Sequence, residues 1–67
     1  MPPKFRDAIR IVEEDGWRQV SVRGSHRQFR HPTKKGKVTI AGHPSKDVPP
    51  GLWASIMRQA DIERRGQ

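Results

Sequence analysis

The chain has 67 residues, with 14 Lys and Arg against 7 Asp and Glu, a net charge of +7 and no cysteine. This length allows one small domain whose core is too small for a deep cofactor pocket, so any function has to lie on an open face. The lack of cysteine excludes disulfides, thiolate metal sites and cysteine nucleophiles, and the positive charge favours a polyanionic partner, either nucleic acid or an acidic protein, over a role in solubility alone.

The first predicted element is a helix over residues 3–15. Pro3 suits the first turn of a helix, where a missing N–H costs nothing. Apolar residues recur at helical spacing from Phe5 to Val12, and Gly16 is a typical stop just past a helix end. No apolar signal segment opens the chain and its apolar runs are far too short for a membrane span, so we expect a soluble, cytoplasmic protein.

Two strands joined by a tight turn are predicted next. Val20 and Val22 alternate with polar residues, which is the period of a half-buried strand. Gly24 and Ser25 then fit a two-residue hairpin loop of type II′, with Gly at the first central position. This turn fixes the register and predicts three opposed pairs: Arg23 with His26, Ser21 with Gln28, and Val20 with Phe29.

A third strand and a second helix complete the predicted fold. Pro32 ends the second strand, and residues 37–40 alternate again after a turn. A loop covers residues 42–47, and a helix begins near residues 49–50 and runs to about residue 61 or 62. Residues 1–62 are therefore expected to form a single domain, and residues 63–67 a flexible C-terminal tail.

The order helix, three antiparallel strands, helix predicts an α+β fold with both helices on one face of the sheet. We expect the helix-covered face to carry the apolar strand residues Val20, Val22, Phe29, Val38 and Ile40. The opposite face is expected to be basic and hydrogen-bonding, with Gln19, Ser21, Arg23, His26, Gln28, Arg30, Lys37 and Thr39.

The candidate chemistry centres on His26, which follows the Gly-Ser turn with arginines before and after it. Histidine moves protons near neutral pH, and the planar donor fork of arginine matches phosphate oxygens. Arg27 is the next residue along the strand after His26, so its side chain is expected on the opposite, helix-covered face. We therefore expect His26 to act as general acid or base in RNA cleavage, with a further cationic cluster at residues 34–37. The expected substrate-binding residues are Arg23, Gly24, Ser25, Gln28, Arg30 and Lys37.

Two other histidines could supply a second proton-transfer group or serve as structural hydrogen bonders, and the structural role is favoured for both. His31 is two residues after Phe29, so its side chain is expected on the same side of the sheet, toward the helices. His43 lies in a loop before Pro44. No carboxylate or cysteine lies at ligand spacing from the histidines, so we expect no metal and no other cofactor.

A long collinear set of motifs runs from about Phe5 to Ile62. It comprises Asp15-Gly16-Trp17, Gly24-Ser25-His26-Arg27-Gln28-Phe29, His31-Pro32-Thr33-Lys34, Val38-Thr39-Ile40, Gly42-His43-Pro44-Ser45-Lys46-Asp47, Pro50-Gly51 and Ser55-Ile56-Met57-Arg58-Gln59-Ala60. These motifs resemble the HicA toxin family of bacterial and archaeal toxin–antitoxin pairs. Asp61 stands where relatives often carry Gly and is expected to affect only the helix cap.

The resemblance implies a fold like that of a double-stranded RNA-binding domain. It also implies a ribonuclease that cleaves messenger RNA and is silenced by a cognate HicB antitoxin. The family's activity depends on the histidine of the Gly-Ser-His motif, which is His26 in this chain.

Two other functions stay open. The first is a non-catalytic RNA-binding module of double-stranded-RNA-binding type, but such modules usually carry a lysine cluster at the start of the second helix. Here that helix begins with residues 49–53, Pro-Pro-Gly-Leu-Trp, and Arg58 is its first cation. The second is an interaction protein whose basic face only receives an acidic partner.

Overall fold

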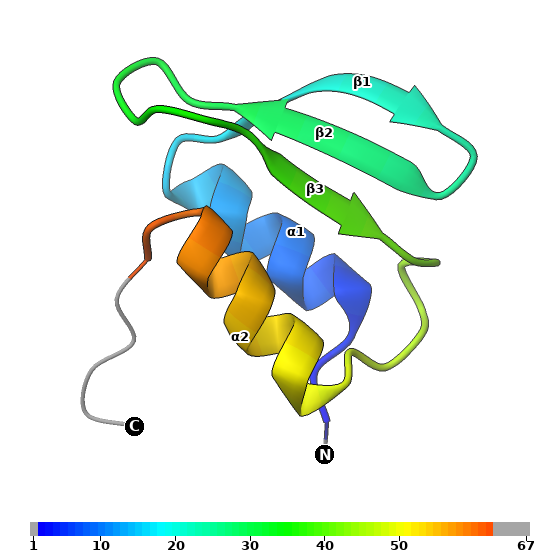
Figure 1. Ribbon diagram of the computed structural model, residues 1–67. Coiled ribbons are helices and arrows are strands. Elements are labelled where there is room, and N and C mark those ends of the chain that lie inside the picture. The colour runs from blue at the N-terminus through cyan, green and yellow to red at the C-terminus, as the bar shows by residue number, and fades with distance from the viewer. Residues whose placement is uncertain (1, 63–67) are drawn as a thin grey trace.

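The computed structural model describes residues 2–62, and the predicted tail at residues 63–67 lies outside the described residues. Its elements in chain order are α1 (Phe5–Glu14), β1 (Arg18–Arg23), β2 (His26–Arg30), β3 (Val38–Ala41) and α2 (Pro50–Gln59). The strands form one antiparallel sheet in the order β1-β2-β3, with both helices beneath the same face (Figure 1). The predicted α+β class and element order are confirmed.

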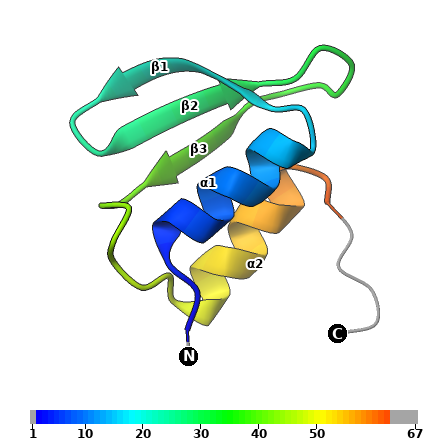
Figure 2. The ribbon, with the colours of Figure 1, turned by 180° about the vertical axis from the view of Figure 1, so that it is seen from behind.

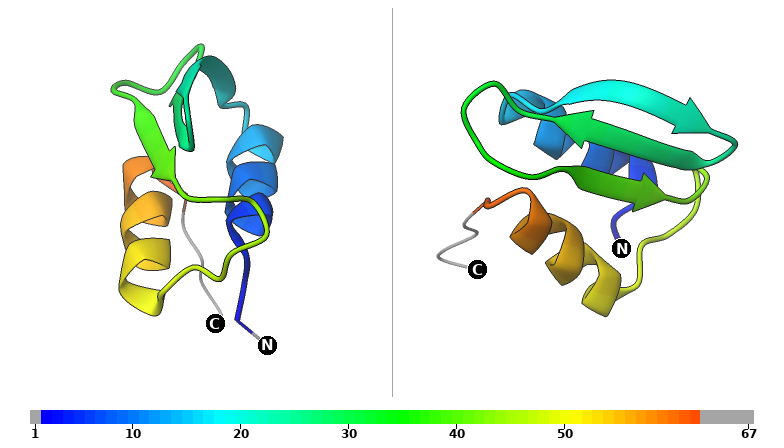
Figure 3. Two further views of the ribbon diagram at one scale, coloured as in Figure 1. Left: turned by 90° about the vertical axis from the view of Figure 1, so that its right-hand side faces the viewer. Right: turned by 45° about the horizontal axis from the view of Figure 1, so that its top comes forward.

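The molecule has two layers, and the view from behind shows the helices side by side beneath the sheet (Figure 2). Neither helix in the described part of the chain is long and apolar enough to cross a membrane. The face of the sheet away from the helices is left open (Figure 3). The fold therefore separates a packed side of the sheet from a side available for binding.

Helix α1 begins two residues later than predicted because Lys4 is held in an extended conformation. Lys4 forms an isolated β-bridge with Asp47, and its ammonium lies 2.9 Å from the carboxylate of Asp47. The carboxylate of Asp7 accepts the backbone N–H of Lys4 at 2.8 Å, which satisfies one donor at the helix start. Beyond the helix end, Gly16 adopts a φ of 110°, and a Cβ there would lie 2.7 Å from the ring of His31.

The predicted hairpin between β1 and β2 is confirmed. Gly24 has a φ of 57°, whereas Ser25 has no positive φ, which is the pattern of a type II′ turn. Two of the three predicted pairs are present, because Arg23 lies opposite His26 and Ser21 lies opposite Gln28.

The third predicted pair is wrong because β1 contains a β-bulge between Gln19 and Ser21. The bulge inserts Val20 as an extra residue, so Gln19 takes the position opposite Phe29. The change of register moves Gln19 to the side of the sheet that Phe29 occupies. Val20 moves to the open side with Ser21, where it lines a hollow together with Gln28.

Val20 and Val22 are 59% and 50% exposed, so their predicted place in the core is also wrong. Val22 does lie on the helix side of the sheet, because it pairs with Arg27, which pairs in turn with the buried Ile40. However, every residue of the edge strand β1 is exposed. The helices therefore cover β2 and β3 and leave the underside of β1 uncovered.

The core is a single layer between β2, β3 and the two helices. Its buried side chains are Phe5, Ala8, Val12, Trp17, Phe29, Val38, Ile40, Val48, Ile56, Met57 and Ala60. Trp17, which precedes β1, is 1% exposed and supplies the largest apolar group. Within residues 2–62 no polar or charged residue is fully buried, so the core contributes by burial of apolar surface.

This burial pattern predicts that Val20→Thr and Val22→Thr each change the free energy of unfolding by less than about 0.5 kcal/mol, because both side chains are largely in water. Val38→Thr is the matched control, since Val38 is fully buried. We expect that variant to lose about 1–3 kcal/mol, because a hydroxyl replaces a methyl in the core. Urea unfolding followed by circular dichroism measures all three, and equal losses would contradict the exposure of Val20 and Val22.

Candidate functional site

The open face of the sheet, which we call the platform, is rich in cations and hydrogen-bonding groups. The pairing of the strands and the lining of two hollows assign its residues, which are Arg18, Val20, Ser21, Arg23, His26, Gln28, Arg30, Lys37 and Thr39. Compared with the predicted face, Arg18 and Val20 are added and Gln19 is lost. Nothing in the residue alternation indicates this exchange, because the bulge shifts only the residues on its N-terminal side.

Two hollows lie on the platform and share Gln28. The first, the His26 hollow, has a volume of about 450 Å³ and is lined by Ser21, Arg23, His26, Gln28 and Thr39. The second, the Arg30 hollow, has a volume of about 410 Å³ and is lined by Val20, Gln28, Arg30, Gly36 and Lys37. Five of the seven predicted site residues therefore meet in these hollows, whereas Gly24 and Ser25 line neither.

His26 opens the central strand, between Arg23 of β1 and Ala41 of β3. The side chain of His26 is exposed, and neither ring nitrogen has a hydrogen-bond partner among residues 2–62. Directly opposed residues place their Cβ atoms about 4.5–5.5 Å apart, so the imidazole and the guanidinium of Arg23 can reach the same anion. Such an arrangement can transfer a proton and neutralise negative charge at one centre.

The hairpin tip beside His26 is tied to the rest of the sheet. The carbonyl oxygen of Ser25 accepts the backbone N–H of Gly42 at 3.1 Å, just past the end of β3. A Cβ on Gly42 would lie 2.4 Å from the ring of Phe5, so glycine is required for this close packing. The tip therefore takes its position from the core as well as from its own turn.

The other end of the platform carries a row of three cations across the sheet. Arg18 lies opposite Arg30, and the β2–β3 register, in which Phe29 faces Val38, extends to place Lys37 opposite Arg30. Like charges at opposed positions destabilise a sheet. In the part of the chain that the structure describes, the ion pairs all lie off the platform: Lys4 with Asp47, Arg10 with Asp7, and Lys34 and His31 with Asp15. An anion bound between these cations would relieve their repulsion.

Arg27 lies on the side of the sheet opposite to His26, as parity predicts. It pairs with Val22 and with the buried Ile40, and its Nη1 atom is buried without a hydrogen-bond partner in the described chain. Its guanidinium therefore belongs to the underside of the sheet. Of the two arginines beside the Gly-Ser-His segment, only Arg23 reaches the His26 hollow.

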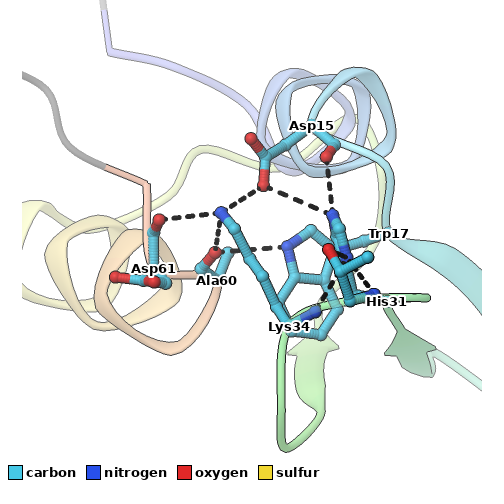
Figure 4. Close-up of polar contacts among 7 residues, drawn as sticks. Asp15, Trp17, His31, Lys34, Ala60 and Asp61 are labelled. Carbon is cyan, nitrogen blue, oxygen red and sulfur yellow. Dashed lines mark hydrogen bonds and ion pairs between the residues drawn. The ribbon is translucent and has the colours of Figure 1, made fainter.

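His31 is a structural hydrogen bonder, and all its polar atoms have partners within the fold (Figure 4). Its Nε2 donates to the carbonyl oxygen of Asp15 at 2.8 Å. Its Nδ1 accepts the backbone N–H groups of Thr33 and Lys34 at 3.0 and 3.1 Å. The ring meets Trp17 edge-on, with the ring centres 5.2 Å apart.

His43 also bonds locally, because its Nδ1 lies 2.9 Å from the hydroxyl of Ser45. Neither His31 nor His43 lines the two hollows. Within residues 2–62, no three His, Asp or Glu side chains come together in a group that could hold a metal ion.

A comparison with protein families supplies the context for this platform. The family model described as HicA toxin of bacterial toxin-antitoxin matches residues 5–62. The chain belongs to the HicA toxin family. A comparison with curated proteins finds no match. The HicA match runs from the first residue of α1 to beyond the end of α2, so it spans the core, the platform and both hollows.

Residues from three of the sequence motifs, together with Asp61, lie beneath the platform and form what we call the Lys34 clamp. The ammonium of Lys34 donates to the carboxylate of Asp15 at 2.6 Å and to the carbonyl oxygens of Ala60 and Asp61 at 3.1 and 2.8 Å (Figure 4). The indole N–H of Trp17 donates to the same Ala60 oxygen at 3.2 Å. The clamp thus joins the C-terminal ends of both helices to the loop after β2.

The Lys34 clamp changes the interpretation of two residues. Lys34 was expected to belong to a cationic cluster at residues 34–37, but its charge is used inside the fold. Asp61 adopts a φ of 54°, the left-handed conformation that often ends a helix and that glycine takes most readily. Its carbonyl oxygen also accepts from Lys34, so this residue takes part in the clamp as well as in the helix cap.

Removal of the ammonium in Lys34→Met is expected to lower the free energy of unfolding by about 1–3 kcal/mol, because hydrogen bonds from a charged donor to three acceptors are lost. Lys35→Met, at the exposed neighbouring position, is the matched control and should change it by less than about 0.5 kcal/mol. Urea unfolding measures both variants. A Lys34→Met protein as stable as the Lys35→Met protein would contradict a structural role for the clamp.

Proposed function

We propose that this HicA-family chain is an endoribonuclease that cleaves messenger RNA without a metal ion, with His26 as general acid or base. The observation that carries the proposal is the His26 hollow. There an exposed imidazole faces Arg23 on a surface whose cations have no carboxylate partner among the described residues. This combination suits a polyanionic substrate that reacts by proton transfer.

RNA supplies its own nucleophile, so the chemistry asked of the protein is small. The 2′-oxygen attacks the adjacent phosphorus, the bond from phosphorus to the 5′-oxygen breaks, and the products end in a cyclic phosphate and a 5′-hydroxyl. One proton leaves the 2′-hydroxyl and one reaches the departing 5′-oxygen. His26 transfers one of these protons, a role worth about 10²–10⁴-fold in rate. Arg23 neutralises the charge on the five-coordinate phosphorus.

The platform supports binding that depends on phosphates rather than on stacked bases. Its residues include no aromatic ring apart from the imidazole of His26, because Trp17 and Trp53 lie in or against the core. Hydrogen-bonding side chains such as Gln28 and Thr39 line the His26 hollow. Binding should therefore tolerate many sequences and weaken steeply as salt concentration rises.

A non-catalytic module for double-stranded RNA is the alternative that the same element order allows. Such a module uses cations at the start of its second helix to contact phosphates. In α2 the first turn contains Pro50, Gly51 and Leu52, and the only cation of the helix is Arg58 in its last turn. The cations instead gather on the open face of the sheet, around His26, and this distribution favours the nuclease.

The family also implies an antitoxin, and we propose that a HicB-like antitoxin protein silences the chain by covering the platform. An acidic surface on that partner would pair with cations that have no carboxylate partner among residues 2–62. Covering the His26 hollow would exclude RNA without any change in the fold.

His26→Ala is expected to lower the rate of cleavage of a labelled messenger RNA by about 10²–10⁴-fold, because the proton-transfer group is removed. The assay is single-turnover cleavage with a chelator present. RNA binding and the urea midpoint should change little, since the imidazole is exposed and makes no hydrogen bond in the described chain. A His26→Ala protein that degrades RNA at the wild-type rate would refute the proposed mechanism.

The two arginines beside His26 in the sequence give a matched pair of variants for the same assay. Arg23→Gln should slow cleavage. It should also lower the slope of log RNA affinity against log salt concentration by the amount that about one phosphate contact contributes. Arg27→Gln, on the opposite side of the sheet, should leave both quantities close to wild type. Equal losses in the two variants would mean that overall charge matters and the His26 hollow does not.

Masking by the antitoxin predicts inhibition with a fixed stoichiometry. Increasing amounts of the partner, taken from the neighbouring reading frame, should reduce RNA cleavage linearly to zero at the ratio of the assembled complex. The Arg23→Gln variant should bind this partner more weakly, because a platform cation is lost. Full cleavage activity in the purified complex would exclude masking.

A further inference from the structure

The Arg30 hollow has no role in the proton-transfer chemistry of His26, although it lies next to that site. It shares Gln28 with the His26 hollow and has nearly the same volume, about 410 Å³. His26, Gln28 and Arg30 occupy successive same-face positions of β2, and each step along the strand is about 6.6 Å. An RNA strand that lies along β2 with its reacting phosphodiester over His26 therefore extends across Gln28 toward Arg30.

The Arg30 hollow has the charge required by a phosphate. Arg30 and Lys37 line it from opposed positions, and Arg18 lies opposite Arg30 on its other side. The guanidinium of Arg30 donates through Nη1 to the carbonyl oxygen of Gly36 at 3.2 Å. This hydrogen bond directs the side chain toward the loop that carries Lys37, which leaves other N–H groups of the guanidinium for an anion. A bound phosphate would remove the repulsion within this row of cations.

The Arg30 hollow also has one apolar wall, which a site for phosphate alone does not need. Val20 lines it and is 59% exposed, because the β-bulge in β1 turns this side chain onto the platform. An exposed valine beside two cations offers a surface for the apolar faces of a ribose or a base. The hollow therefore combines the two kinds of contact that a nucleotide makes.

We propose that the Arg30 hollow binds the nucleotide two phosphates away from the cleaved phosphodiester, because two steps of about 6.6 Å separate Arg30 from His26. Its phosphate lies on Arg30 and Lys37 and its sugar or base against Val20. This inference rests on the proposed ribonuclease function and adds a second subsite to it. The subsite makes cleavage depend on a phosphate that does not react. It makes Val20, Arg30 and Lys37 substrate-binding residues that hold the strand while His26 acts on it.

The test uses oligodeoxynucleotides that carry a single ribonucleotide, because only that position has a 2′-hydroxyl and can be cleaved. In two further substrates a neutral methylphosphonate replaces the phosphate two steps to the 5′ side or two steps to the 3′ side of the cleaved bond. The wild-type chain should lose about 10-fold in kcat/KM on one of these substrates, because a charge-assisted contact is lost. It should lose little on the other.

Lys37→Gln and Arg30→Gln should show the same loss on the all-phosphate substrate and no further loss on the sensitive methylphosphonate substrate. Lys35→Gln is the matched control, because Lys35 is exposed in the same loop and lines neither hollow.

Val20→Asp should also lower kcat/KM on the all-phosphate substrate, whereas Val22→Asp, on the other side of the sheet, should not. A second readout, the affinity for an uncleavable all-deoxy strand, should fall in Lys37→Gln and not in Lys35→Gln.

The outcomes separate this inference from the proposed function. If cleavage requires His26 but the methylphosphonates affect wild type and Lys37→Gln alike, the second subsite is refuted and the nuclease proposal stands. If Lys35→Gln loses as much affinity and activity as Lys37→Gln, the effect is one of general charge and the subsite is again refuted. If the wild-type chain cleaves no substrate, or if His26→Ala cleaves as fast as wild type, both proposals fail.

Discussion

The ammonium group of Lys34 is the point at which three separate parts of the chain meet. From the loop between β2 and β3 it bonds residues just past the ends of α1 and α2, and Trp17 shares one of its acceptors. Because the same loop is held from below by the ring of His31, the position of the β2–β3 connection is set by the helix layer. The sheet can then lie over a small core without an ion pair among the described residues of its outer face to hold it there.

The charges of the chain divide between the two layers. In the described residues, the carboxylates that form ion pairs belong to α1 and to loops, where their partners are Lys4, Arg10, His31 and Lys34. Among residues 2–62, the cations of the sheet have no such partner. The cations that form ion pairs therefore belong to the helix layer and the loops, and the cations of the platform keep their positive charge unpaired within residues 2–62. Such a surface attracts a polyanion over a distance of about 10 Å at moderate salt.

Local patterns in the sequence predicted the parts of the structure that depend on neighbouring residues. The Gly24-Ser25 turn gave the pairing of Arg23 with His26, and alternation placed Arg27 and His31 away from the platform. The bulge could not be predicted, because Val20 and Val22 alternate as in a regular half-buried strand. The exposure of Val22 could not be predicted either, because it depends on how far the helices reach under β1. The role of Lys34 could not be predicted either, because its acceptors lie 19 to 27 residues away along the chain.

The uncovered edge strand has a consequence for how this small protein can change. Since no side chain of β1 is buried, substitutions there alter the outer surface without creating cavities. The strand that tolerates substitution most readily is thus also one that contributes Arg18, Val20, Ser21 and Arg23 to the platform. Variation in β1 is therefore a route by which related chains could change their exposed surface while keeping the same interior.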